Sequence, residues 1–242
     1  MNEIKYPKSI EPCPILEATV ELRCKFLIPG DAVVGVIYNG FRNEFDLSGL
    51  PMNQIPVEVR RIDPNLKHKP THRLSNSSNR NLIIDIGADV IMLTYMLKYE
   101  GWNTFKPFIE ESLNNILGLN IIAETSYLSL RYLDFFQNNI FNDIILKTTL
   151  DNKLIGSTPT VIRTEIHEED IAYVLQVANN AHVENQLLKA DGSIIDITSV
   201  LRLIPISNNS IIDLIEKLHR GHKKIFFSLF THEFLQTLNP KY

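Results

Sequence analysis

Two glutamates are the first residues of this sequence whose type and spacing could bind a ligand. Glu17 and Glu21 lie four positions apart in a segment of alternating polar and apolar residues. In a strand, both carboxylates project to the same face, roughly 13 Å apart. That separation is too large for the paired carboxylates of a glycosidase. Either glutamate could hold a cationic ligand or pair with Arg23 or Arg131, although a solvated strand face explains both more simply.

Arg131 lies in the middle of a second alternating segment. Leu128, Leu130 and Tyr132 share one face of that segment, so Arg131 projects to the other face. If a second layer covers Arg131, its guanidinium needs an acidic partner, because an unpaired buried charge is costly. The candidate partners are Glu17, Glu21 and Asp196. The sequence favours a structural ion pair over an anion-binding role for Arg131.

Three aromatic residues, Tyr99, Trp102 and Phe105, follow one another at helical spacing. Such a stripe could form an aromatic platform for a ligand or a protein partner. More often a stripe of this kind belongs to the core. We interpret the trio as core and keep Trp102 as a candidate for the lining of a ligand site.

The histidines His219, His222 and His232, the last followed by Glu233, are the cluster that most resembles a set of metal ligands. A spacing of three on a helix can place two imidazoles on one ion. Gly221, however, is expected to interrupt the helix between the first two, and the pattern is not HExxH. Neighbouring lysines and arginines would also repel a metal ion. We interpret the cluster as a surface feature, suited to a helix C-terminus or an anionic partner.

Three aspartates, Asp85, Asp89 and Asp196, allow a second metal hypothesis, a metal-dependent hydrolase built on Asp85, Asp196 and a histidine. Asp89 resembles a turn residue, and no lysine follows at the spacing typical of nucleases. The sequence contains no phosphate-binding loop, no dinucleotide-binding fingerprint and no nucleophile elbow. The sequence therefore predicts no cofactor, and it contains no recognisable set of catalytic residues.

Composition limits the possible partners. The net charge of −4 argues against a general nucleic-acid binder, which would carry a basic footprint. Cys13 and Cys24 are too few for a secreted disulfide framework. No apolar run reaches the roughly 18 residues of a membrane helix, and residues 1–14 lack the apolar stretch of a signal peptide. We expect a cytoplasmic protein without membrane contact, whose oligomeric state the sequence leaves open.

Periodicity predicts the elements that position these residues. Alternation predicts strands at residues 15–26, 57–62, 82–86, 90–95, 128–134, 161–167, 172–178 and 194–203. Helical stripes predict helices at residues 31–41 and 103–118, a helix that opens at Ser210 and is interrupted at Gly221, and a last helix at residues 222–238. The polar segment 63–81 is predicted to be a loop or a long hairpin turn.

The order of these elements predicts an α+β fold, with antiparallel sheets and helices packed on one face. Residues 1–118 and 119–242 would form two halves, each running β-α-β-β-β-α, within one compact unit. The two first strands share a similar core, so we expect a diverged tandem repeat. A groove where the halves meet would be the natural place for a ligand.

Several short motifs, in this order and spacing, resemble those of an uncharacterised, sporadically distributed family of bacterial proteins of about this length. They are PCPILEATVELR at 12–23, YxxWxxF at 99–105, LRY at 130–132, IDI at 195–197 and HxxIxxxLF at 222–230. Two positions depart from the family pattern: Asp134 stands where an asparagine is expected, and Thr198 where a second acid is expected. The resemblance implies a shared fold and a bacterial origin. It brings no activity, cofactor or catalytic residue.

Our leading hypothesis is a non-catalytic module that binds a small ligand or a protein in the groove, with Glu17, Glu21, Arg131 and Trp102 as its lining. The rival is the metal-dependent hydrolase of Asp85 and Asp196. A third hypothesis, a component of a larger defence or toxin-neutralising assembly, follows from the sporadic distribution of the resembling family.

Overall fold

The computed structural model describes residues 6–156, 158–184, 189–202, 206–207 and 210–242. Its main strands, in chain order, are β1 (Ile15–Phe26), β2 (Phe45–Gly49), β3 (His72–Asn76), β4 (Leu82–Ile86), β5 (Val90–Met96), β6 (Ile122–Phe136), β9 (Val161–Glu168), β10 (Ile171–Glu184) and β11 (Lys189–Leu201). The short strands β7 (Thr149–Leu150) and β8 (Lys153–Leu154) form a separate ribbon. The α-helices are α1 (Gly30–Phe41), α2 (Val57–Ile62), α3 (Trp102–Gly118), α4 (Ile211–Ser228) and α5 (His232–Thr237).

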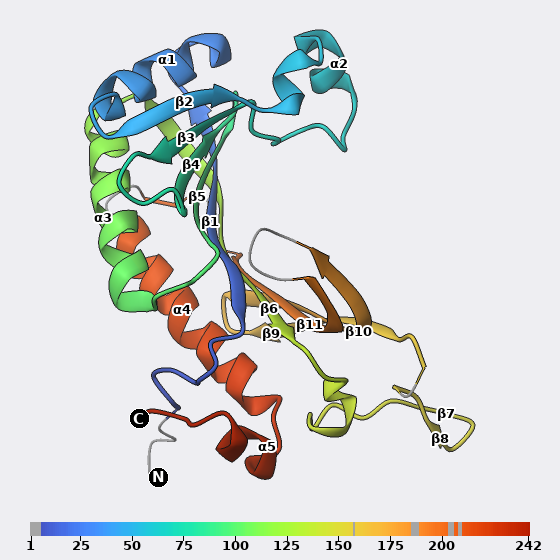
Figure 1. Cartoon of the computed structure of the whole chain (residues 1–242). Helices are drawn as coiled ribbons and strands as arrows, with labels where there is room; N and C mark the ends of the chain where they lie inside the picture. The colour runs from blue at the N-terminus through green and yellow to red at the C-terminus, as the bar shows by residue number, and fades with distance from the viewer. Residues whose placement is uncertain (1–5, 157, 185–188, 203–205, 208–209) are drawn as a thin grey trace.

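Within the described ranges, the main strands form one nine-stranded sheet in the order β2-β3-β4-β5-β1-β6-β11-β10-β9. Every neighbouring pair in it is antiparallel. The long helices α1, α3 and α4 lie on the same face of the sheet (Figure 1). The predicted α+β class, with an antiparallel sheet and helices on one face, is confirmed.

The long strands β1 and β6 pair at the centre of the sheet, with Val20 opposite Leu130 and Thr19 opposite Arg131. Outward from this pair, β5, β4 and β3 follow on one side, and β11, β10 and β9 on the other. Residues on either side of position 118 thus contribute separate runs of strands to one sheet. Descent of the two halves from a duplication remains a prediction.

The core lies between the sheet and the three long helices. On α1 the stripe Val33, Val34, Ile37 and Phe41 is buried, as its spacing predicts. From the sheet, the alternate residues that face the helices are fully buried, among them Leu22, Leu93 and Leu130. Among the helices of the described ranges, none is long and apolar enough to cross a membrane.

Two sequence predictions in the first half are wrong. Residues 57–62 form the short helix α2 instead of a strand, and Val59 and Ile62 stay exposed. Valine alternation indicates a strand only where a sheet buries one face, and here the segment packs into no sheet. The polar segment 63–81 contains strand β3, which pairs with both β2 and β4. Backbone pairing from two neighbours outweighs its polar composition.

The predicted break at Gly221 is also wrong, because α4 runs through this glycine to Ser228. A Cβ atom built on Gly221 would lie 2.0 Å from the hydroxyl of Tyr173 on β10. Tyr173 is itself buried and cannot move aside freely. The glycine therefore permits the close approach of α4 to the sheet, at the usual cost in helix propensity.

We predict that Gly221→Ala lowers the free energy of unfolding by about 1–3 kcal/mol, because the new methyl group overpacks the contact with Tyr173. The matched control is Gly35→Ala in α1, where an added Cβ meets nothing within 4 Å. There we expect a gain of about 0.5–1 kcal/mol. Chemical denaturation measures both, and Tyr173→Phe should partly rescue Gly221→Ala. Equal effects of the two alanine substitutions would contradict this account of Gly221.

Candidate functional site

The structure separates the four residues that the sequence offers as a ligand site. Glu17, Glu21 and Arg131 lie on the sheet face opposite the long helices, where β1 and β6 pair. Trp102 opens α3 on the helix side of the sheet and packs against α4. The first three therefore belong to one surface, and Trp102 belongs to a different site.

Arg131 is held by two acids on neighbouring strands. Its Nε and Nη2 atoms donate to both carboxylate oxygens of Asp196 at 2.8 and 2.7 Å, and Nη1 lies 3.3 Å from Oε1 of Glu17. These contacts raise the pKa of Arg131, chiefly through the hydrogen bonds to Asp196. Glu21 accepts from Nε of Arg23 at 2.7 Å. The predicted structural ion pair of Arg131 is confirmed.

The two aspartates of the hydrolase hypothesis lie far apart on this face. Arg73 donates to both oxygens of Asp85 at 2.7 Å, while Asp196 is bound by Arg131. Asp85 is on β4 and Asp196 on β11, with three strands between them, a separation of about 19 Å at usual strand spacing. Among the described residues, no group of three His, Cys, Asp or Glu side chains could hold a metal ion.

We predict that Arg131 and Asp196 couple by about 1 kcal/mol in a double-mutant cycle to alanine, because the pair is bidentate and partly shielded. The matched control is the pair Arg80 and Asp46, which has the same residue types and a 2.7 Å contact but is far more exposed. That pair should couple by less than about 0.5 kcal/mol. Urea denaturation of the wild type and the six variants gives both values, and equal coupling would contradict the prediction.

A pocket of about 280 Å³ lies on the helix side of the sheet, beside the C-terminal end of β6. Its walls come from residues 8–15, from residues 99–102 at the start of α3, from β6, and from α4. The lining thus combines residues from both sides of position 118. It is mostly apolar, with Ile10, Pro14, Phe226 and Phe227 among its residues, and it includes several titratable groups.

Backbone hydrogen bonds fix the segment that forms the outer wall of this pocket. Glu11 N donates to Leu238 O at 2.8 Å, and Lys241 N donates to Ser9 O at 2.9 Å. On the other side, Phe135 N of β6 donates to Pro14 O at 2.8 Å. Residues 8–14 are therefore tied to the sheet and to residues 238–241.

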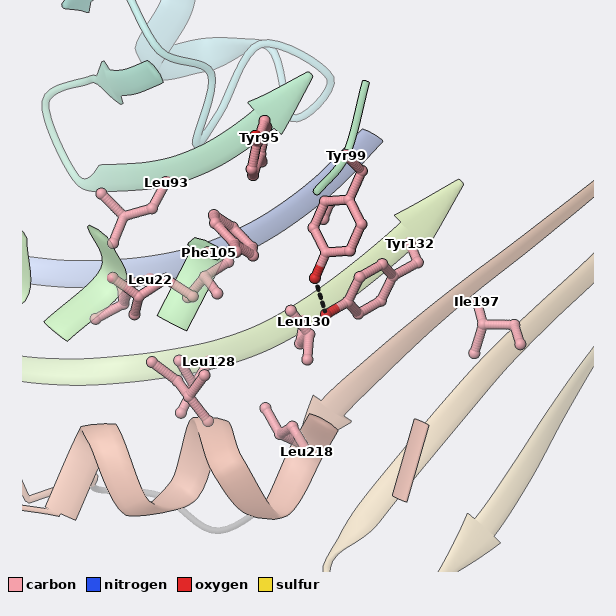
Figure 2. Packing of buried hydrophobic residues seen from close by; sticks show 14 of the residues in the cluster. Leu22, Leu93, Tyr95, Tyr99, Phe105, Leu128, Leu130, Tyr132, Ile197 and Leu218 are labelled. Carbon is pink, nitrogen blue, oxygen red and sulfur yellow. Dashed lines mark hydrogen bonds between the residues drawn. The ribbon is translucent and has the colours of Figure 1, made fainter. Parts of the chain in front are cut away.

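Aromatic side chains build the inner wall around two histidines. The ring of Trp102 stacks on His219, with centroids 3.9 Å apart and planes within 7°. The hydroxyls of Tyr99 and Tyr132 lie 3.3 Å apart, as Figure 2 shows, and Tyr132 lies 3.2 Å from Nδ1 of His219. When His219 carries its proton on Nε2, its Nδ1 atom can accept a hydrogen bond from the hydroxyl of Tyr132. That hydroxyl can in turn accept a hydrogen bond from the hydroxyl of Tyr99. Burial raises the pKa of both tyrosines, so these hydroxyls stay protonated.

The interpretation of the histidine cluster as a surface feature is wrong for His222; His219 is half-buried, and His232 is exposed as expected. Because α4 continues through Gly221, His222 falls on its buried stripe and is only 4% exposed, with Nδ1 3.4 Å from Ser199 Oγ. Burial lowers the pKa of His222 to about 3, and the charge of His219 adds to this effect. Burial, followed by the nearby cations, of which Lys223 is the strongest, lowers the pKa of His219 to about 3. Both imidazoles are neutral at ordinary pH.

Asp134 is the least expected residue of the pocket. It lies near the end of β6, on the helix-facing side, and is 1% exposed. Burial raises the pKa of its carboxyl well above the ordinary value, and the charge of Asp196 adds to the shift. Its Oδ2 atom has no hydrogen-bond partner within the described part of the chain. Burial therefore favours the neutral form of the Asp134 carboxyl, and Oδ2 keeps unused hydrogen-bonding capacity.

We predict that acidification from about pH 6.5 to 4.5 destabilises the protein. The unfolded chain takes up protons at His219 and His222 near pH 6.5, while the folded chain does not until about pH 3, so each histidine costs at most about 1.4 kcal/mol per pH unit. Asp134 acts oppositely, because its carboxyl keeps a proton in the folded state that the unfolded state loses above about pH 4.

Asp134→Asn should therefore steepen this loss of stability on acidification. Urea denaturation at a series of pH values measures the slope for each variant. His232→Gln, at an exposed histidine, is the control and should keep the wild-type slope. A slope for Asp134→Asn equal to or shallower than that of the wild type would show that Asp134 is ionised in the folded protein.

Sequence reasoning missed the pocket role of Asp134 and the burial of His222, although a signal for each was present. Asp134 continues the alternation of Leu128, Leu130 and Tyr132, which places an acid on the buried face. His222 continues a helical stripe through Leu218 and Ile225, provided that Gly221 does not end the helix. The close contact with Tyr173, which leaves no space for a Cβ atom at position 221, explains why a glycine stands within this helix.

Comparison of the chain with protein-family models, with characterised proteins and with solved structures gave no match. Membership in the resembling bacterial family therefore stays a prediction, and the function is argued from the site.

Proposed function

We propose that this protein is a non-catalytic binding module that holds a small ligand in the pocket between residues 8–15, β6 and α4. The observation that carries the proposal is the composition of the pocket: a volume of about 280 Å³ with a mostly apolar lining that includes a few buried polar groups. Small-molecule sites generally combine apolar walls with a few fixed polar groups, and this volume lies at the lower end of their range.

Binding is favoured over catalysis because the histidines, tyrosines and cysteine of the pocket are in protonation states that suit catalysis poorly. A histidine with a pKa of about 3 is a weak general base at neutral pH, and His219 and His222 both have such values. Partial desolvation also raises the pKa of Cys13, although its side chain is exposed, and this disfavours the nucleophilic thiolate. Burial raises the pKa values of Tyr99 and Tyr132 as well, so their hydroxyls are hard to ionise. The pocket offers hydrogen bonds and apolar contact.

The opposite face of the sheet supports binding less well. There Glu17, Arg131 and Asp196 satisfy one another in ion pairs, as do Arg73 and Asp85. A ligand would have to break these contacts before it gained its own. The proposal therefore keeps Trp102 as a lining residue and assigns the ion pairs to the stability of the sheet.

Trp102 supplies a reporter for testing the proposal, because it is the only tryptophan of the chain and lines the pocket. We predict that a library of single-ring compounds contains binders that shift the indole N–H signal of Trp102 in proton–nitrogen NMR spectra. Dissociation constants in the millimolar range are expected for compounds of this size.

Cys13→Phe should abolish these shifts by filling the pocket from its outer wall. Ser78→Phe, the same kind of enlargement on an exposed loop, is the matched control and should leave them intact. If the library yields no binder, or if Cys13→Phe leaves binding unchanged, the pocket is not a ligand site and the proposal is wrong.

A further inference from the structure

The carboxyl group of Asp134 points to the chemical class of the ligand, an inference that rests on the proposed function. Asp134 lines the pocket and is almost completely buried, and Oδ2 finds no hydrogen-bond partner among the residues that the structure describes. Buried polar atoms in folded proteins are nearly always hydrogen-bonded, and each exception needs an explanation. A ligand that occupies the pocket and pairs with this carboxyl provides one.

The protonation state of Asp134 defines what the ligand must offer. Because burial keeps this carboxyl neutral, it presents one O–H donor and one carbonyl acceptor side by side. The complementary group has an acceptor and a donor at the same spacing on one edge. A primary carboxamide or a lactam has this arrangement, with the N–H and the C=O on the same side. A carboxylate ligand lacks the donor.

Charge in the rest of the lining disfavours a cationic ligand. Lys8 and Lys223 both line the pocket, and burial together with the charge of Lys8 lowers the pKa of Lys223. Lys223 also helps to keep His219 neutral. A cation in the pocket would add to this unfavourable positive charge while losing its own hydration. Among the acids of the lining, Glu11 is already paired with Lys241, and Glu100 lies just before α3. Asp134 would have to give up its proton before it could compensate a cation.

The walls of the pocket favour a flat ring. Trp102 and His219 form a stacked pair of planar rings in the lining, which also includes Phe226, Phe227 and Ile10. Aromatic walls of this kind bind flat, apolar ring faces. A volume of about 280 Å³ accommodates one ring with a small substituent. We propose that the pocket takes a small, neutral, planar ring whose carboxamide or lactam edge forms a pair of hydrogen bonds with Asp134.

Four probes of matched shape test this proposal on the whole chain: benzamide, N-methylbenzamide, benzoate and benzamidine. Benzamide has an N–H on the same side as its carbonyl, whereas the N–H of N-methylbenzamide points to the opposite side. Benzoate and benzamidine keep the shape of benzamide but carry a negative and a positive charge. Titration against the Trp102 indole signal gives each dissociation constant. We expect benzamide to bind at millimolar concentration, and each of the others to bind at least about tenfold more weakly, a difference of about 1.4 kcal/mol.

Two variants separate the role of Asp134 from a merely structural one. Asp134→Leu should weaken benzamide about tenfold while leaving the binding of toluene, which has no polar edge, unchanged. Asp134→Asn carries the same donor and acceptor pair and should retain benzamide. The comparison of the four probes on the wild-type protein needs no variant, so a failure of Asp134→Leu to fold leaves the test intact.

The possible failures are distinguishable. If N-methylbenzamide, benzoate or benzamidine binds as well as benzamide, or if benzamide does not bind at all, the assignment of a carboxamide or lactam is wrong. The proposed function survives that result as long as other single-ring compounds shift Trp102 and lose their effect in Cys13→Phe. If no compound does so, both proposals fail together.

Discussion

The pairing of β1 with β6 at the centre of the sheet is the constraint from which the rest of the structure follows. A strand alternates its side chains, so one register divides the two strands into an apolar set that faces the helices and a charged set that faces away. Val20 and Leu130 belong to the first set, and Glu17 and Arg131 to the second. A slip of one residue would bury the guanidinium of Arg131 among aliphatic side chains and expose Leu130. Burial of the apolar side chains fixes the register, and this register places the charged residues of β1, β6 and β11 where they can form ion pairs.

The two faces of this sheet treat polar groups in opposite ways. On the face away from the helices, charged side chains pair with partners of opposite charge on neighbouring strands, as Asp196 does with Arg131. On the helix side, burial favours the uncharged forms of three polar groups of the pocket, Asp134, His219 and His222. Desolvation explains the difference, because an uncharged group loses less on leaving water than an ion does. The same chain therefore holds an ionic surface on one side of this strand pair and, on the other side, a pocket in which the most deeply buried polar groups are uncharged.

Much of the fold was predictable, because it depends on local patterns. Alternation identified β1, β4, β5, β6 and β10, and the helical stripes identified α1 and α3. The errors fell where tertiary contacts outweigh local preference. The valines of α2 alternate but have no sheet to join, and β3 is polar but has a strand on either side. Gly221 resembles a helix stop, yet the contact of α4 with Tyr173 makes use of the missing side chain.

The candidate site shows the same division. By itself, the sequence determined the α+β class, the shared face of Glu17 and Glu21, the ion pair of Arg131 and the largely buried aromatic trio that includes Trp102, because each depends on periodicity within one or two segments. Only the tertiary structure decided that Trp102 and Arg131 lie on opposite sides of the sheet, and that Asp134 and His222 meet in one pocket with residues 8–15. Some of those contacts join segments that are more than two hundred positions apart in the sequence. Their energies come from burial, which no local pattern encodes.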